Sequence, residues 1–283
     1  SMAKKPTDIE FLLKKPPKPK FKLDSFANPL ANPAQLQKAK LQENPKVDTI
    51  VEKVVSDTDL KSTEAMLKLY KSGKSSSEII KLLSSGLLGI KIQRKLVPTK
   101  WSITAFDDTI SKILLKNVKQ YPWLNEYLLF HHEYLGNHYE IILLPKEWGF
   151  EVIEAESRNP YSPNNDFLIF SDYEDFYGRK DYANSVTGAY YSNKLGCCEY
   201  LSKIKRQASV LILREVKPEY YAPLGVGILR EATRFALAQQ PEKFQTLKEA
   251  LNQAQTRLTV DINRLTQNSR LLRSLQQVKL TMF

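Results

Sequence analysis

Apolar side chains recur at helical spacing through residues 50–84. The valines and isoleucine at 50–55 predict a first helix, and the pattern over 60–73 predicts a second. The polar triplet 57–59 has the composition of an N-terminal cap for this second helix, which Gly73 ends. A third helix is predicted over 76–84, after which two glycines break the chain. These segments predict a small helical layer.

The hydrophobic period changes to two residues near position 127, which is typical of strands with one buried face. Tyrosine-rich and leucine-rich runs joined by a turn at Gly136-Asn137 predict a hairpin. Because the predicted strands follow one another closely, they indicate an antiparallel meander. The strands are predicted at 127–134, 139–144, 150–156 and 167–171, with another strand-like run at 210–213.

Helical patterns return on both sides of these strands. Asp107-Asp108-Thr109 predicts the N-terminal cap of a helix that ends near Val118. A long helix is predicted over 183–207, where Gly188 and Gly196 permit close packing. Three more helices are predicted at 226–239, 244–258 and 261–275. The predicted fold class is therefore α+β, with a mostly antiparallel sheet flanked by helical layers and a helical C-terminal region.

The first 47 residues differ in composition from the rest. They contain seven of the fifteen prolines, and lysines alternate with prolines at 14–20. Since proline fixes φ and lacks an N–H, such a stretch cannot continue a helix or a central strand. We predict an extended, partly polyproline-like basic arm that lies along the body through side chains such as Phe11 and Leu12. A wholly disordered tail is the alternative. The expected organisation is an arm at 1–47, a body at 48–275 and a terminal peptide at 276–283.

The net charge of +11 is concentrated at the two ends of the chain. Residues 1–47 have 10 basic and 4 acidic side chains, 48–255 have 27 and 26, and 256–283 have 5 and 1. Basic ends on a nearly neutral body suit electrostatic binding to DNA, with an affinity that falls as salt rises. The alternatives are a role in solubility alone and an adaptor whose basic arms bind acidic proteins.

The sequence carries no targeting signal that changes this picture. No run approaches the roughly 18 apolar residues that span a bilayer, and the first residues lack the apolar core of a secretion signal. Cys197 and Cys198 are adjacent, so an ordinary disulfide between them is awkward, and we expect both to pack as small apolar groups. These features predict a soluble cytoplasmic protein, associated with the nucleoid and without a membrane partner.

The strongest nucleic-acid motif lies in residues 91–101. Cations can bind phosphates and an indole can stack on a base, so we predict that this segment binds DNA. Packing of the tryptophan in the core is the alternative. The predicted DNA-binding residues are Lys91, Arg94, Lys95, Lys100 and Trp101, together with Arg179 and Lys180 farther along the chain.

Several carboxylates could instead form a catalytic site. A metal-dependent, structure-selective nuclease needs two or three carboxylates converging on Mg²⁺ or Mn²⁺, with a cation near the phosphate. The alternative for the first two candidates is a helix cap, and for the last two a solvated turn. The candidates for catalysis are Asp107, Asp108, Asp172 and Glu174.

The three histidines flank the predicted hairpin turn. Strand alternation places His131 and His132 on opposite faces of the sheet, so we do not expect His131, His132 and His138 to bind a metal together. The sequence therefore predicts no metal site and no certain cofactor. No phosphate loop, dinucleotide fingerprint or nucleophile elbow occurs.

The last seven residues, QVKLTMF, form most of a sliding-clamp-interaction peptide. In such a peptide a glutamine amide, here Gln277, fills a small polar pocket. One helical turn then presents two apolar anchors, here Leu280 and Phe283, to a hydrophobic groove. The usual motif has one more aromatic residue than this chain provides. The alternative is an amphipathic turn packed on its own domain.

Two blocks resemble the most distinctive stretch of the archaeal Nre family of DNA repair proteins: LVPTKWSITA at 96–105 and DDTIS at 107–111. The resemblance extends from about residue 44 to the C-terminus. Further blocks follow in the family's order at 57–59, 85–89, 133–137, 178–179, 182–183, 188–191, 214–218 and 223–226.

The resemblance implies a role in DNA damage repair. Many family members are similar in ending with a clamp-interaction motif. The resemblance therefore implies that Gln277, Leu280 and Phe283 bind the sliding clamp (PCNA). Members often begin with a cysteine-rich, zinc-finger-like segment. A Lys/Pro arm stands in that place here, so zinc is not expected. The family supplies no established catalytic residue, and none is transferred.

Overall fold

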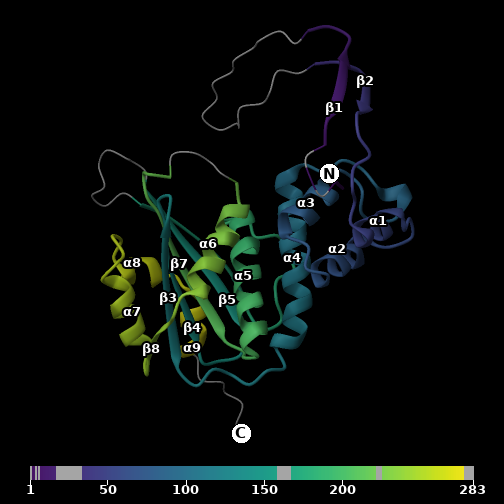
Figure 1. Ribbon diagram of the computed structural model, residues 1–283. Coiled ribbons are helices and arrows are strands. Elements are labelled where there is room, and N and C mark those ends of the chain that lie inside the picture. Colours follow the sequence, from purple (N-terminus) through teal and green to yellow (C-terminus); the bar gives the residue numbers. More distant parts are fainter. Residues whose placement is uncertain are drawn as a thin grey trace. The chain divides into compact units, whose positions relative to one another are not determined.

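The structure, a computed structural model of the 283-residue chain, describes residues 2–3, 5, 7–16, 34–157, 167–220 and 225–276 (Figure 1). The chain divides into two compact units, Ser1–Ser102 and Ile103–Phe283. The division falls inside helix α4 (Thr99–Val118). None of the described helices is long and apolar enough to cross a membrane.

Short amphipathic helices form the core of the first unit. Their apolar stripes bury Val54, Leu69 and Ile79, which confirms the predicted helical layer. The last helix starts with a capping box. The Ser75 hydroxyl accepts a hydrogen bond from the Glu78 amide, and the Glu78 carboxylate accepts one from the Ser75 amide. The helices are α1 (Thr49–Ser56), α2 (Ser62–Lys71) and α3 (Ser76–Ser84).

The polar triplet 57–59 does not cap α2, contrary to the prediction. Helix α2 begins later, and its N-cap residue Lys61 makes no side-chain capping bond. The Asp57 carboxylate instead accepts hydrogen bonds from the amides of Asp59 and Leu60. Its side chain therefore stabilises the turn after α1, which is a common use of aspartate.

The N-terminal arm contains two short strands, which the sequence analysis did not predict. Strand β1 (Ile9–Leu13) pairs antiparallel with β2 (Leu36–Leu41). Phe11 and Leu12 are 59% and 54% exposed, so the prediction that they pack along the body was wrong. The prolines at 17–33, with the apolar residues among them, lie outside the described residues.

The second unit is built on a six-stranded sheet of order β6-β5-β7-β4-β3-β8 (Figure 1). β5 and β7 run parallel, and the other neighbouring pairs are antiparallel. The predicted meander is therefore wrong, because β7 lies between β5 and β4. The apolar β7 is buried almost throughout, which suits a central strand. The strands are β3 (Tyr127–Tyr134), β4 (Asn137–Leu144), β5 (Gly149–Ser157), β6 (Phe167–Glu174), β7 (Ser209–Val216) and β8 (Glu242–Phe244).

Helices cover both faces of this sheet, as the predicted α+β class requires. One face packs on α4, α5 (Gly188–Ile204) and α6 (Gly227–Ala238). The other packs on the C-terminal helices, as Figure 1 also shows. Residues that alternate along each strand therefore enter two separate cores. The C-terminal helices are α7 (Leu247–Gln255), α8 (Ile262–Thr266) and α9 (Arg270–Gln276).

Three helix boundaries differ from the predictions. Helix α4 begins at Thr99, so Asp107 and Asp108 lie in its middle and do not cap it. Helix α5 begins at Gly188, not at 183. The helix predicted at 261–275 is interrupted between α8 and α9. Asp107, predicted to cap a helix, instead forms a buried ion pair with Arg230.

Close packing of α5 on α6 depends on a glycine, as the sequence predicted. A Cβ atom at Gly196 would lie 2.7 Å from Thr233 Cγ2. We therefore expect Gly196→Val to lower the free energy of unfolding by about 1–3 kcal/mol, because the helices must move apart. Urea unfolding measures the change. Lys203→Ala on an exposed turn of α5 is the control, expected within about 0.5 kcal/mol of wild type. Equal urea midpoints for Gly196→Val and Lys203→Ala would contradict the close packing of α5 on α6 at Gly196.

Candidate nucleic-acid interface

Residues 91–101 form an exposed surface of the first unit. Ile92 is 92% exposed, Leu96 80% and Trp101 65%. Core packing of Trp101, the alternative from sequence, is therefore wrong. Exposed apolar side chains that lie close together are typical of an interaction surface. Lys91, Lys95 and Lys100 are also exposed. This surface, residues 91–101, is called the basic segment below.

Arg94 holds the basic segment in place. Its Nε, Nη1 and Nη2 atoms donate to the carbonyl oxygens of Gly89, Val55 and Asp57 at 2.7, 2.8 and 2.8 Å. Three donors on three carbonyls fix a guanidinium firmly. Arg94, predicted to bind DNA, is therefore assigned to positioning its neighbours.

A glycine allows the basic segment to approach the first unit closely. A Cβ at Gly86 would lie 2.8 Å from the Lys95 backbone, and Gly86 has φ +68°, which favours glycine. The Val97 amide also donates to the Ser84 carbonyl at 3.0 Å. The backbone of the segment is thus pinned, while its lysines and its exposed apolar side chains face solvent.

The four predicted catalytic carboxylates are each engaged by a cation. Asp107 is fully buried, and its oxygens lie 2.6 Å from Arg230 Nη1 and 2.7 Å from the Ser192 hydroxyl, which donates to it. Burial raises the pKa of the Asp107 carboxyl, and the contacts with Arg230 and Ser192 oppose that rise. Asp108 pairs with Lys112 at 2.6 Å, one helical turn away. This pair is partly exposed.

Asp172 and Glu174 lie on β6 and are also neutralised. Asp172 pairs with Arg179 at 2.9 Å and accepts hydrogen bonds from the amides of Ser185 and Val186. Glu174 pairs with Lys194 at 2.8 Å and accepts from Trp148 Nε1 at 2.9 Å. The predicted solvated turn is wrong for both residues, which are 6% and 3% exposed. Sequence reasoning missed Lys194 and Arg230, which lie far along the chain from their partners.

A small cavity of about 190 Å³ brings together four of the predicted residues, Asp108, Glu174, Arg179 and Lys180. Arg179 also donates to the carbonyls of Tyr173 and Tyr182, at 3.0 and 3.1 Å, so most of its hydrogen-bonding capacity is used inside the fold. Lys180 is exposed. Both acidic and basic side chains line this cavity, so its charge does not clearly favour an anion.

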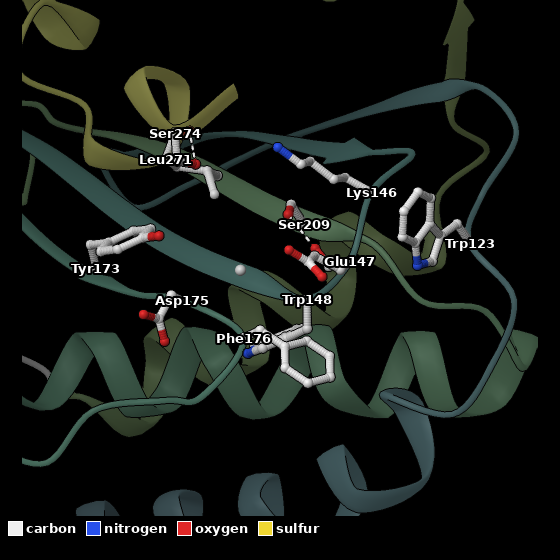
Figure 2. Close-up of a pocket in the computed structure, with 11 residues that line it drawn as sticks. Trp123, Lys146, Glu147, Trp148, Tyr173, Asp175, Phe176, Ser209, Leu271 and Ser274 are labelled. Atoms are coloured by element: carbon white, nitrogen blue, oxygen red, sulfur yellow. Dashed lines mark hydrogen bonds between the residues drawn. The ribbon is translucent and has the colours of Figure 1, made fainter. Parts of the chain in front are cut away.

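The second unit also has a larger cavity of about 550 Å³ (Figure 2). Trp123, Tyr173 and Phe176 offer aromatic walls, and Lys146 supplies a cation. Buried Trp148 lines this cavity and donates its indole N–H to Glu174 of the smaller one. The larger cavity has the volume and the mixed aromatic and polar lining that are typical of small-molecule sites.

The catalytic candidates do not assemble into a metal site within the described residues. There, one group of three ligand atoms lies close enough to hold an ion, on the opposite face of the sheet: His131, His138 and Glu140. As predicted, alternation separates His131 from His132, whose ring stacks near Phe235 of α6. The clamp-peptide residues Gln277, Leu280 and Phe283 lie outside the described residues.

Comparison with known proteins identifies the family. The profile for the N-terminal region of archaeal Nre matches residues 1–161, and the profile for its C-terminal region matches 174–283. The chain belongs to the archaeal Nre family. This confirms the resemblance to the Nre family that was based on residues 96–105 and 107–111. No solved structure matches the Nre chain significantly.

Three relatives of the Nre chain are named DNA repair proteins. It is 40% identical over 255 residues to DNA repair protein NreA of Archaeoglobus fulgidus, covering 90% of this chain and 64% of that protein. DNA repair protein NreB of the same organism is 37% identical over 274 residues, with coverages of 96% and 69%. DNA repair protein NreA of Haloferax volcanii is 35% identical over 284 residues, with coverages of 98% and 67%. The chain thus spans about two thirds of the length of these relatives.

Proposed function

We propose that this Nre protein is a DNA repair factor that binds DNA through the basic segment and is recruited by the sliding clamp through its C-terminal peptide. The observation that carries the DNA-binding half is the exposed Trp101 beside three exposed lysines. The names of its relatives support the repair role. Recruitment by the clamp rests on the motif at 277–283 and its basic surroundings.

The chemistry of the basic segment favours unpaired DNA. An indole can stack only on a base whose face is accessible, as in a single strand, a gap or a frayed end. Lysines act as point charges on phosphates and carry no sequence information. We therefore propose binding that tolerates any sequence and prefers single-stranded regions, with Lys91, Lys95 and Lys100 on the backbone.

Replacement of the tryptophan tests the stacking contact. We expect Trp101→Ala to weaken single-stranded DNA binding by about 1–3 kcal/mol, the usual contribution of one base–aromatic stack. Fluorescence anisotropy with a labelled oligonucleotide at low salt measures the affinity. Trp123→Ala is the matched control, since Trp123 is 53% exposed but belongs to the other unit. Equal losses in both variants, or none, would contradict the proposed site.

Salt dependence tests the lysines independently. Replacing all three lysines by glutamine removes three phosphate contacts, so we expect the slope of log affinity against log salt to fall by about 2 units on single-stranded DNA. Lys203, Lys205 and Lys243 replaced together form the control, since they lie in the other unit. A protein that ignores DNA even at low salt would favour the adaptor for acidic proteins.

Catalysis by the four carboxylates has no support in their geometry. Each is neutralised by a cation at 2.6–2.9 Å, and within the described residues they form no three-ligand group. A nuclease metal site needs two or three carboxylates that converge on the ion. We therefore propose a binding function and assign these residues to the fold.

A further inference from the structure

The hairpin of β3 and β4 gathers histidines and carboxylates on the sheet face that packs on α7–α9. Leu135 and Gly136 at its turn both have positive φ, 48° and 71°, which is typical of a two-residue hairpin loop. That turn sets a register in which His131 pairs with Glu140 and Glu133 with His138. Because side chains of one strand alternate between faces, all four residues lie on the same face.

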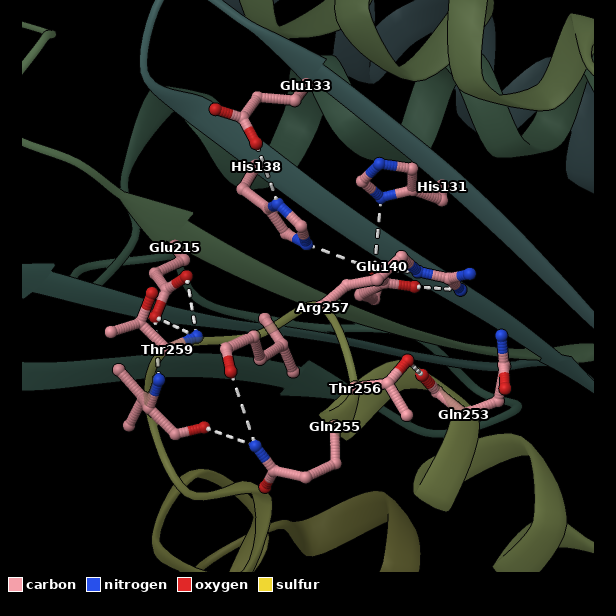
Figure 3. Close-up of polar contacts among 12 residues, drawn as sticks. His131, Glu133, His138, Glu140, Glu215, Gln253, Gln255, Thr256, Arg257 and Thr259 are labelled. Atoms are coloured by element: carbon pink, nitrogen blue, oxygen red, sulfur yellow. Dashed lines mark hydrogen bonds and ion pairs between the residues drawn. The ribbon is translucent and has the colours of Figure 1, made fainter.

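Both imidazole rings point at a single carboxylate (Figure 3). His131 Nδ1 and His138 Nε2 each lie 3.0 Å from Glu140 Oε1. The three ligand atoms all lie within 4.8 Å of one another. Ligands of a tetrahedral zinc ion at ordinary bond lengths are roughly 3.3 Å apart. The two nitrogen–oxygen distances of 3.0 Å are within a few tenths of an ångström of this value.

The orientation of His138 matches that of a metal ligand. Its Nδ1 lies 3.1 Å from Glu133 Oε2, so a proton on Nδ1 is held by that carboxylate while Nε2 faces Glu140. A carboxylate on the far nitrogen is the usual partner of a metal-binding histidine, since it fixes the ring and its tautomer. Lys217 in turn holds Glu133 at 2.8 Å.

His131 has an unused nitrogen directed at the same place. Its Nδ1 is buried and makes no hydrogen bond, although it lies 3.0 Å from Glu140 Oε1. The side chain as a whole is 35% exposed, whereas His138 and Glu140 are 2% and 0% exposed. An ion can therefore approach from the His131 side, and a water molecule can complete its coordination there.

The charges around the cluster also leave room for a cation. Glu140 accepts from Arg257 at 2.8 and 2.9 Å, and Arg257 contacts Glu242 at 2.7 Å. Glu215 faces the same region beside His138 and accepts from the amides of Thr259 and Val260. Within this group, four carboxylates face two cations, and a divalent ion would balance the difference. The members are Glu133, Glu140, Glu215, Glu242, Lys217 and Arg257.

We propose that His131, His138 and Glu140 bind one divalent transition-metal ion of the zinc class, with Glu133 as the positioning partner of His138. Two imidazoles and one carboxylate are a ligand set that suits zinc and leaves its fourth position for water. Glu140 would then bridge the ion and Arg257, next to α7. This site does not depend on the proposed DNA binding.

Titration of the full-length, chelator-treated protein with Zn²⁺ tests the proposal. Calorimetry is expected to give one ion per chain, and Co²⁺ in its place is expected to give the visible absorption of a tetrahedral site. His131→Ala should abolish both signals, while its partly exposed position keeps the fold intact by circular dichroism. Glu133→Gln should weaken binding about 10–100-fold, the usual effect of losing such a partner.

His132→Ala is the matched control, since His132 is adjacent in sequence but lies on the opposite face. It should bind Zn²⁺ as the wild type does. A rise in melting temperature with Zn²⁺ should occur in the wild type and the control but not in folded His131→Ala. Absence of saturable binding, or binding that His131→Ala leaves unchanged, would overturn the site and leave the cluster as an ion-pair network.

Discussion

Replacing Arg230 with methionine is expected to lower the free energy of unfolding by about 3–5 kcal/mol. Asp107 is 0% exposed and Arg230 5%, so the change would leave a buried carboxylate without its cation. The Ser192 hydroxyl would still donate a hydrogen bond to that carboxylate, but it carries no charge. Urea unfolding of the full chain, followed by circular dichroism, measures the loss. Removal of both charges in Asp107→Leu/Arg230→Met should recover much of it, because neither group is then unpaired.

The neighbouring ion pair provides the control for this prediction. Asp108 pairs with Lys112, whose side chain is 61% exposed, so Lys112→Met should cost less than about 1 kcal/mol. An Arg230→Met protein as stable as the Lys112→Met protein would show that the buried pair has no structural role. Asp107 would then again be a candidate for chemistry.

Removing residues 277–283 is expected to abolish binding to the sliding clamp. In a helix-in-groove peptide most of the affinity comes from a few apolar anchors, so Phe283→Ala alone should cost at least about 2 kcal/mol, or roughly 30-fold. Calorimetry with the purified clamp from the same organism measures both changes. Lys279→Ala is the matched control, since that side chain lies between the proposed anchors in sequence and is not one of them.

Measuring DNA binding and clamp binding in the same variants tests the two parts of the proposed function independently. Deletion of 277–283 should leave the effect of Trp101→Ala on single-stranded DNA unchanged, because the two segments act on different partners. Clamp binding that persists at full strength after the deletion would rule out recruitment through this peptide. It would not affect the basic segment, whose test is the tryptophan variant.

The basic segment could be predicted because its evidence is local. Lysines beside a tryptophan within 91–101 are visible in the sequence, and the exposure of Trp101 then excluded core packing. The role of Arg94 could not be predicted. Its carbonyl partners include Val55 and Asp57, which lie 39 and 37 residues away. Only the folded first unit brings these carbonyls to the guanidinium.

The histidine cluster was not predicted, because the turn was predicted at Gly136-Asn137, one residue later than the observed loop at Leu135-Gly136. A turn at Leu135-Gly136 implies that His131 faces Glu140 and that Glu133 faces His138. Strand alternation correctly separates His131 from His132. The carboxylates beside the histidines were not predicted, since they depend on the hairpin register. Pairing along a hairpin is a local property and follows from the turn.

The sequence by itself determined the local elements: the helices near 50–84, the β3–β4 hairpin and the close packing allowed by Gly196. These follow from periodicity, turn residues and the absence of a side chain, which act over a few neighbouring positions. The tertiary structure alone decided the place of β7 between β5 and β4, and the pairing of Asp107 with Arg230, 123 residues apart. Both are contacts between segments that are distant in sequence. Such contacts form only when the whole sheet is buried between its helices.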